Sequence, residues 1–443
     1  MTDTPTPSVR QYVEWIHSGK VTSEQLVQAC LSRIEETDTD ILAWTTIDKE
    51  LVLKQAKEMD DWRWRGKPVG ELHGIPVGIK DIFDTSDLPT ERGSAIYSER
   101  QPDADSAVVE KLREAGAIIL GKTATTEFAW MHPTTTRNPL DPARTPGGSS
   151  SGSAAAVAAG QVPLAIGSQT GGSTIRPASF CGIYGFKPSR GIISRRGALQ
   201  TSATLDQVGV FATDLGDLAL LSDVLSGYDA TDSKSYLAPR PKMLKGYLSD
   251  PPIEPNFAWL DMPYQNSYCD SIREGVQELE LSLGKQFDRL PVPSSFSGLV
   301  EAHKAIYGYE IFRCLDAEQK QLDLTSTTFQ DNIKQAGQRT KAEYDEALEI
   351  LTASNAWFKD FFNEYDGILT PSALGEAPVL ADGTGDPICC VVWTLCGLPS
   401  LSLPLMVGEN GLPIGIQLVG AYNEDDRLFR SARWLVEFLR GSD

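Results

Sequence analysis

The sequence predicts a single large α/β domain built on a mixed β-sheet. Short apolar runs typical of buried strands alternate with amphipathic helical segments from one end of the 443 residues to the other. A chain of this length can bury a large core, either as one α/β domain or as two or three domains of ~150 residues. No Ser/Pro/Gly-rich linker divides it, which favours one domain.

The elements can be placed from local patterns. Residues 8–37 carry two amphipathic helical patterns, and the second opens with a capping box from Thr22 to Gln25. An Ile/Val run bounded by Gly and Pro predicts a buried strand between 69 and 84. Further along we expect helices at 106–115 and 153–159, a helical and polar segment at 250–365, and strands at 117–120, 163–166, 368–371, 401–405 and 414–419.

Composition narrows the function. There are 40 Lys and Arg against 60 Asp and Glu, a formal net charge of −20, which disfavours binding to nucleic acid or to an anionic membrane. No apolar run reaches the ~18 residues of a membrane span, and the opening residues lack the pattern of an export signal. Seven cysteines without metal-ligand spacing are typical of reduced, mostly buried thiols. We therefore expect a cytoplasmic protein.

Acidic residues are absent from 142–205. At the average frequency these 64 residues would hold roughly nine Asp and Glu, yet there are none. The same stretch contains six Lys and Arg, Arg176 among them. Burial of a Gly/Ala/Ser-rich segment is one explanation, and a site that stabilises a developing negative charge is the other.

A serine follows two glycines inside this stretch, in the run from Thr170 to Ser173. Consecutive glycines allow backbone N–H groups to converge on an anion, so Ser173 could attack a carbonyl whose oxygen enters that concavity, although most such runs are simple turns. Serine then needs a base. The four histidines are better explained as packing or surface residues, whereas Lys80 ends an apolar strand, where burial lowers a lysine pKa. On residue type alone, a salt bridge from Lys80 to Asp81 or Asp84 is the more ordinary expectation.

Residues 148–152 match the G-x-S-x-G elbow of another hydrolase class. That motif requires a strand directly before it, and the proline-rich segment 138–146 is a poor strand. We therefore disfavour this alternative.

Three motifs together resemble the amidase signature family of amide hydrolases. They are Gly78-Ile-Lys80-Asp, Arg144-Thr-Pro-Gly-Gly-Ser149-Ser and Thr170-Gly-Gly-Ser173, continuing through 177–182 and 185–189. The resemblance covers nearly the whole chain except 250–365. It implies one domain over 1–443, a twisted mixed sheet surrounded by helices, a signature core at 60–215 and a variable substrate-pocket region at 250–365.

The resemblance also implies a Ser-cisSer-Lys triad. Ser173 corresponds to the nucleophile, Ser149 to the serine after a cis peptide bond, and Lys80 to the base. The spacing 173 − 149 = 24 residues is that of the family and selects Ser149 over its serine neighbours. The N–H groups of Thr170, Gly171, Gly172 and Ser173 would form the oxyanion hole.

Two positions depart from the common family wording. Gln169 stands where Asp is frequent, and an extra Thr174 moves Arg176 to the third position after the nucleophile. This form resembles members that act on small amides bearing a carboxylate, which a bidentate guanidinium could hold. An ion pair that fastens the loop is an equally good use of Arg176.

Three hypotheses for the function follow. The first is a free-standing hydrolase of small C–N amides, the second is the glutaminase subunit of an aminoacyl-tRNA amidotransferase, and the third is an inactive binding member of the family. Retention of Lys80, Ser149 and Ser173 disfavours the third. No nucleotide or metal motif occurs, so we expect no cofactor. A homodimer or a small helper subunit remains open.

Overall fold

The computed structural model describes residues 7–441. The first six residues, which belong to the opening segment that we examined for an export signal, lie outside the described residues. One mixed sheet runs through the fold. The sheet has eleven strands in the order β1-β3-β2-β4-β6-β5-β10-β11-β9-β7-β8. In chain order the strands are β1 Trp44–Thr46, β2 Pro76–Lys80, β3 Ile118–Thr123, β4 Leu164–Gln169, β5 Tyr184–Lys187, β6 Gln207–Ala212, β7 Phe257–Asp261, β8 Phe287–Pro291, β9 Gly367–Pro371, β10 Ser400–Val407 and β11 Pro413–Val419.

Parallel and antiparallel pairs alternate in blocks. Strand β2 pairs in parallel with β3 and β4, and β7 does so with β8 and β9. Between these blocks the pairs β4–β6, β6–β5, β5–β10, β10–β11 and β11–β9 are antiparallel. The predicted mixed sheet within a single domain is confirmed.

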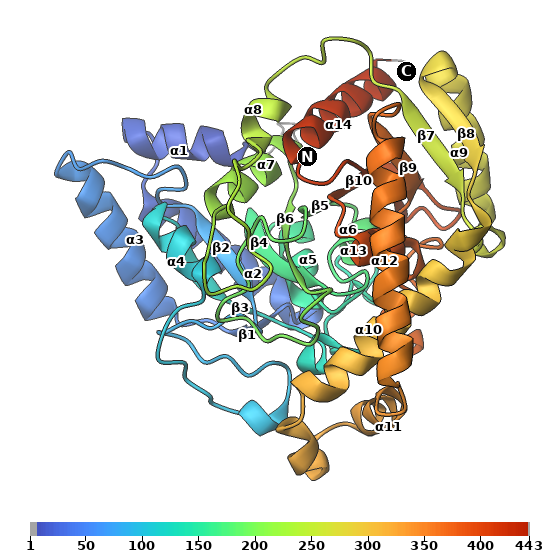
Figure 1. The fold of residues 1–443 in the computed structure, drawn as a ribbon. Coiled ribbons are helices and arrows are strands. Elements are labelled where there is room, and N and C mark those ends of the chain that lie inside the picture. The colour runs from blue at the N-terminus through green and yellow to red at the C-terminus, as the bar shows by residue number, and fades with distance from the viewer. Residues whose placement is uncertain (1–6, 442–443) are drawn as a thin grey trace.

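Helices cover the sheet (Figure 1), with α1, α3 and α4 on one side of the view and α10 to α12 on the other. Their bounds are α1 Val9–Ser18, α2 Ser23–Ile41, α3 Lys49–Trp64, α4 Ala107–Glu114, α5 Ser151–Ala158, α6 Ile175–Cys181, α7 Leu215–Leu225, α8 Met243–Tyr247, α9 Asp270–Leu283, α10 Leu299–Cys314, α11 Thr327–Ala336, α12 Lys341–Phe361, α13 Ile388–Cys396 and α14 Asp425–Arg440.

Local capping explains where α2 begins. The Thr22 side chain accepts a hydrogen bond from the backbone N–H of Gln25, and the Gln25 side chain accepts one from the backbone N–H of Thr22. This reciprocal pair satisfies two N–H groups that the first helical turn would leave unpaired. The predicted capping box is therefore present.

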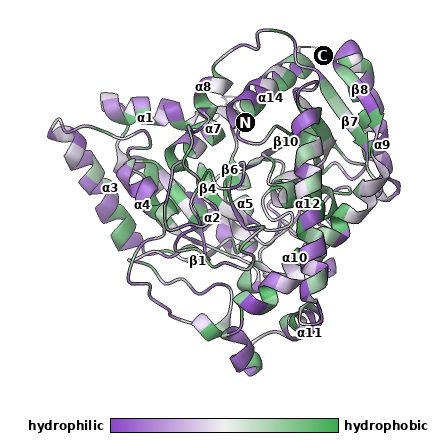
Figure 2. Ribbon diagram, in the orientation of Figure 1, coloured by the Kyte–Doolittle hydropathy of each residue, from purple (hydrophilic) through white to green (hydrophobic). Residues whose placement is uncertain are grey.

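The central strands are buried on both faces. Every residue of β2, β3, β5 and β6 is buried, and Figure 2 shows a largely hydrophobic interior beside helices such as α3 and α9 that also carry hydrophilic residues. A polar side chain at the end of such a strand therefore lies in the interior. Lys80 is the last residue of β2 and has no exposed surface.

The prediction for 250–365 was incomplete. Besides helices it contains β7 and β8, which extend the sheet beyond β9. In β8, the edge strand, only Phe287 is buried, so the alternation that would mark a strand is missing from the sequence. The boundaries 60–215 and 250–365 remain predictions, since the sheet is continuous across both.

Candidate active site

The Lys80 amine lies among three serine hydroxyls. Its Nζ atom is 2.7 Å from Ser149 Oγ, 2.8 Å from Ser168 Oγ and 3.1 Å from Ser150 Oγ. Strand pairing explains the arrangement, because β2 and β4 are parallel neighbours and Ser168 lies near the end of β4. Both hydroxyls from the 149–150 segment approach at the point where α5 begins.

The sequence left a salt bridge from Lys80 as the ordinary expectation, and the structure contradicts it. Asp81 is paired instead with the buried Lys122, at 3.3 Å, and Asp84 with Arg100, at 2.8 Å. Among the residues that the structure describes, no carboxylate forms an ion pair with Lys80. Burial lowers the pKa of the Lys80 ammonium well below its ordinary range, while the more distant carboxylate of Asp206 opposes part of that shift.

An uncharged amine fits the hydroxyls around it. The Ser150 hydroxyl donates its hydrogen to the Ser168 carbonyl oxygen, at 3.2 Å, and therefore accepts a hydrogen from Lys80. A neutral amine has two hydrogens and one lone pair, so one hydrogen and the lone pair remain for Ser149 and Ser168. The lone pair can then accept the hydrogen of a serine hydroxyl, which an ammonium could not do.

Ser149 follows a cis peptide bond from Gly148. Its carbonyl oxygen accepts the N–H of Thr126 at 3.2 Å, and its side chain is 2 % exposed. A Cβ atom on Gly148 would lie 2.7 Å from Thr384 Cγ2, which explains the glycine at that position. The segment before Gly148 has an irregular backbone and contains no strand. The G-x-S-x-G motif is therefore not a hydrolase elbow, as expected.

Ser173 lies in the turn between β4 and α6 and is half-buried. The Gln169 side chain organises this turn, since its Oε1 atom accepts the backbone N–H groups of Thr174, at 2.9 Å, and Ile175, at 3.0 Å. The structure brings Lys80 and Ser149 into direct contact, whereas it gives Ser149 and Ser173 no mutual hydrogen bond. Long or absent catalytic hydrogen bonds are common before a substrate is bound.

The turn presents unused backbone donors. Within the described residues, the N–H groups of Gly171, Gly172 and Ser173 meet no hydrogen-bond acceptor. Neither glycine has a positive φ, so the expected special backbone conformation is not the reason for them. Crowding explains Gly172 instead, because a Cβ atom there would lie 3.1 Å from Pro387 and 3.2 Å from Cys390.

Arg176 is buried beside the Gly148–Ser149 segment. It is 4 % exposed, and its guanidinium donates to the Gly148 carbonyl oxygen at 2.6 Å and to Thr384 Oγ1 at 3.3 Å. Its Nε and one terminal nitrogen have no partner in the described part of the chain. The ion pair that was the alternative use of Arg176 is absent there, and a bond to the backbone next to Ser149 takes its place.

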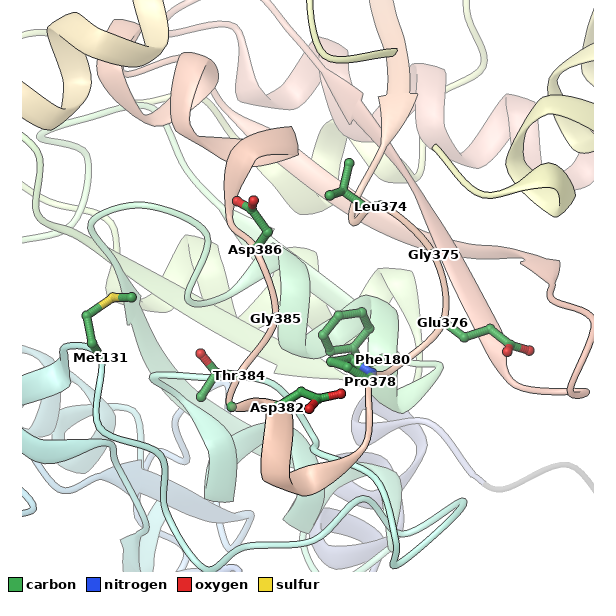
Figure 3. Close-up of a pocket in the computed structure, with 11 residues that line it drawn as sticks. Met131, Phe180, Leu374, Gly375, Glu376, Pro378, Asp382, Thr384, Gly385 and Asp386 are labelled. Atoms are coloured by element: carbon green, nitrogen blue, oxygen red, sulfur yellow. The ribbon is translucent and has the colours of Figure 1, made fainter. Parts of the chain in front are cut away.

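A cavity of about 390 Å³ opens beside these loops (Figure 3). The segment before α13 lines it through Thr384 and Asp386. Thr384 is the residue that packs closely against Gly148, and Asp386 precedes Pro387, which packs closely against Gly172. Met131 approaches from another part of the chain. The remaining lining residues are Phe180, Leu374, Gly375, Glu376, Pro378, Asp382, Gly383 and Gly385.

Residues 378 to 386 supply much of the lining of this cavity, whereas 250–365, the predicted substrate-pocket region, supplies none of it. That 250–365 forms the substrate pocket stays a prediction, since Lys80, Ser149 and Ser173 do not line this cavity. Trp393 is fully buried behind it.

Several contacts of the site were not predicted from the sequence. Ser168 touches Lys80, His303 and Thr394 bond the nucleophile turn, and Asp206 accepts the Thr170 hydroxyl at 2.5 Å. Asp206 alone carried a signal, because it is the first acidic residue after the acid-free stretch. That stretch is mostly buried, and Arg195 within it pairs with Asp232 at 2.6 Å, so burial accounts for much of the missing charge.

Metal ligands and membrane spans are not found in residues 7–441. No group of three or more His, Cys, Asp or Glu side chains there is arranged to hold a metal ion. The seven cysteines are unpaired, five of them buried. None of the described helices has the length and apolar character needed to cross a membrane.

Comparison with known proteins identifies the class. The Amidase family model matches residues 25–429. A glutamyl-tRNA(Gln) amidotransferase subunit of Alkaliphilus metalliredigens is 34 % identical over 94 % of this chain and 93 % of its own length. The chain belongs to the amidase family, whose members are hydrolases that act on amide bonds.

Solved structures agree with that family. A structure described as a vestigial complex that reveals the origins of an s-triazine catabolic enzyme has a TM-score of 0.91 and 28 % identity, covering 97 % of this chain and 98 % of that one. The corresponding glutamyl-tRNA(Gln) amidotransferase subunit of Thermotoga maritima has a TM-score of 0.79 and 28 % identity, with 93 % and 91 % covered. Both the fold and the family are therefore shared over nearly the full length.

Proposed function

We propose that the chain hydrolyses an amide C–N bond to a carboxylic acid and ammonia or an amine, through an acyl-enzyme on Ser173. The observation that carries this proposal is the contact of a buried, carboxylate-free Lys80 amine with the Ser149 hydroxyl at 2.7 Å. A neutral amine in that position is a base, and a base is what a serine nucleophile requires.

The proton relay follows from what each group can accept. As Ser173 attacks the amide carbonyl, Ser149 takes the proton of Ser173 and gives its own to the Lys80 lone pair. The same path in reverse delivers a proton to the nitrogen of the leaving group, and the C–N bond breaks. Water then attacks the acyl-enzyme by the same relay and releases the acid, which returns Lys80 to the neutral amine.

The free N–H groups of the turn would stabilise the negative charge that develops on the substrate oxygen. Attack on the carbonyl carbon places a negative charge on its oxygen, and the unused donors of Gly171, Gly172 and Ser173 lie beside the nucleophile. Such preorganised donors contribute strongly, since loss of a single one costs about 10²- to 10³-fold in turnover elsewhere. We also assign the N–H of Thr170 to this group.

Glutamine is the better supported substrate. The curated relative from Alkaliphilus metalliredigens is named as part of a glutamyl-tRNA(Gln) amidotransferase, and it aligns with 94 % of this chain. This favours the glutaminase-subunit hypothesis over the free-standing hydrolase. In that role the chain would pass ammonia to a partner protein, so a hetero-oligomer is part of the proposal.

A small-molecule amide remains the second candidate. The specific observation in its favour is the higher TM-score with the structure connected to s-triazine catabolism than with the Thermotoga maritima protein. A small helper subunit or a homodimer is compatible with this candidate as well.

Ammonia release and covalent labelling together test the proposal. We expect a fluorophosphonate to label the folded protein at Ser173, and we expect glutamine to give faster ammonia release than aryl, fatty or urea-derived amides. Ser173→Ala abolishes both, whereas Ser297→Ala, an exposed serine, changes neither. Unlabelled Ser173 in folded protein favours the inactive-member hypothesis, and preference for another amide selects the second candidate.

The pH profile tests the base. Because burial depresses the pKa of Lys80 and the neutral amine is the active form, kcat/KM rises with pH through this depressed pKa and is level above it. We expect Lys80→Met to remain folded and lose about 10²- to 10⁴-fold in turnover, the usual contribution of such proton transfer. The exposed Lys320→Met is the matched control. Wild-type rates in Lys80→Met would remove Lys80 from the mechanism.

We further propose that Arg176 attracts a carboxylate on the substrate. Among residues 7–441, no carboxylate contacts the Arg176 guanidinium, and two of its nitrogens have no hydrogen-bond partner. The prediction is that Arg176→Ala raises KM for glutamine about tenfold more than KM for a neutral aliphatic amide of similar length, as loss of a charge-assisted hydrogen bond implies. Equal factors for the two amides would leave Arg176 with a purely structural role.

A further inference from the structure

We infer that His303 and Thr394 are positioning residues that turn the backbone N–H groups of the nucleophile turn toward the substrate. The inference rests on the proposed function and extends it to two side chains outside the three signature motifs. His303 comes from α10, and Thr394 from α13. Both reach the same short turn between β4 and α6.

Three successive carbonyl oxygens of this turn accept hydrogen bonds, two of them from side chains outside the turn. His303 Nε2 is 2.7 Å from the oxygen of Thr170. The Thr394 hydroxyl lies 2.7 Å from the oxygen of Gly171 and 3.1 Å from that of Cys390, and we assign its one hydrogen to the nearer oxygen, that of Gly171. The backbone N–H of Arg176 donates to the oxygen of Gly172 at 3.0 Å. The first two carbonyls are thus fixed by side chains from other helices, and the third by the first turn of α6.

Fixing a carbonyl also fixes the N–H that follows it. A trans peptide unit is planar, and its C=O and N–H point in opposite directions. The donors on Thr170, Gly171 and Gly172 therefore direct the N–H groups of Gly171, Gly172 and Ser173 away from themselves. Those are the three N–H groups that meet no acceptor in the described part of the chain.

The hydrogen-bond partner of His303 fixes which ring nitrogen carries its hydrogen. A carbonyl oxygen only accepts, so His303 carries its hydrogen on Nε2. Burial lowers the pKa of His303 to about 4, so the imidazole is neutral near neutral pH and its one N–H is spent on Thr170. The nitrogen that faces the turn, Nε2, therefore has no lone pair with which to accept the proton of Ser173, in agreement with the choice of Lys80.

Thr394 and the turn itself are held by further contacts. Thr394 Oγ1 accepts the Gln169 amide at 2.9 Å, and Gln169 also accepts the N–H groups of residues 174 and 175. Thr170 is fixed a second time through its hydroxyl, which donates to the buried Asp206 at 2.5 Å. The turn is consequently anchored on both sides of its carbonyls while its N–H groups stay free, which is the preorganisation that an oxyanion hole needs.

Paired substitutions test the two donors. His303→Leu and Thr394→Val remove the donor, and His303→Gln and Thr394→Ser retain one at a similar reach. We expect the first pair to lose about 10- to 100-fold in kcat with KM within twofold, because misplacement of about 1 Å has effects of this size, and the second pair to recover most of that loss. His17→Leu and Thr352→Val, exposed residues of α1 and α12, are the matched controls and keep wild-type kcat.

A bound tetrahedral adduct separates positioning from packing. Affinity for a boronic acid that adds to Ser173 should fall by the same factor as kcat in His303→Leu and Thr394→Val, while inhibition by the carboxylic acid product stays unchanged. Unchanged boronate affinity, or equal loss for boronate and product, overturns the inference. If His303→Leu does not fold, the nearly isosteric Thr394→Val decides the question alone.

The same variants separate failure of the proposed function from failure of the positioning role. Full turnover in Ser173→Ala would refute the proposed function itself. Loss of turnover in Ser173→Ala together with wild-type kcat in His303→Leu and Thr394→Val would refute only the positioning role.

Discussion

The exclusion of carboxylates from the surroundings of Lys80 is the constraint on which the site depends. A lysine at the end of a strand buried on both faces must either find a counter-charge or lose its proton. Here the neighbouring Asp81 is held by Lys122, and three hydroxyls take the place that a carboxylate would fill. Because the Asp81–Lys122 ion pair occupies this neighbouring carboxylate, it helps to keep the Lys80 amine neutral and basic.

The sheet and α13 place the other parts of the site around that neutral amine. Parallel pairing of β2 with β4 places Lys80 beside Ser168, and the chain continues from there into the turn that carries Ser173. The start of α13 packs against this turn through Pro387, while Thr394 bonds it from the same helix. Base, relay and N–H donors thus belong to separate segments that share one rigid scaffold, which is how preorganised sites are generally built.

Much of this was accessible from the sequence, and the remainder depended on long-range contacts. Strand ends, the Thr22 capping box and the order of elements follow from local patterns, and Lys80 was singled out by its place after an apolar run. Strand β8 was missed because an edge strand buries one side chain and shows no alternation. His303 and Thr394 lie 133 and 223 positions from the carbonyls that they bind, and no local pattern encodes such contacts. The pairing of Asp81 with Lys122 rather than Lys80 likewise depends on the packing of β2 against β3.

The protonation state of Lys80 can be observed directly by NMR. In protein labelled with ¹³C at lysine Cε, the signal that disappears in Lys80→Met belongs to this side chain, and its shift reports whether the amine is charged. We expect a neutral amine at neutral pH, with a titration well below the ordinary lysine pKa of about 10.4. A signal that stays at the charged position up to that ordinary value would contradict it.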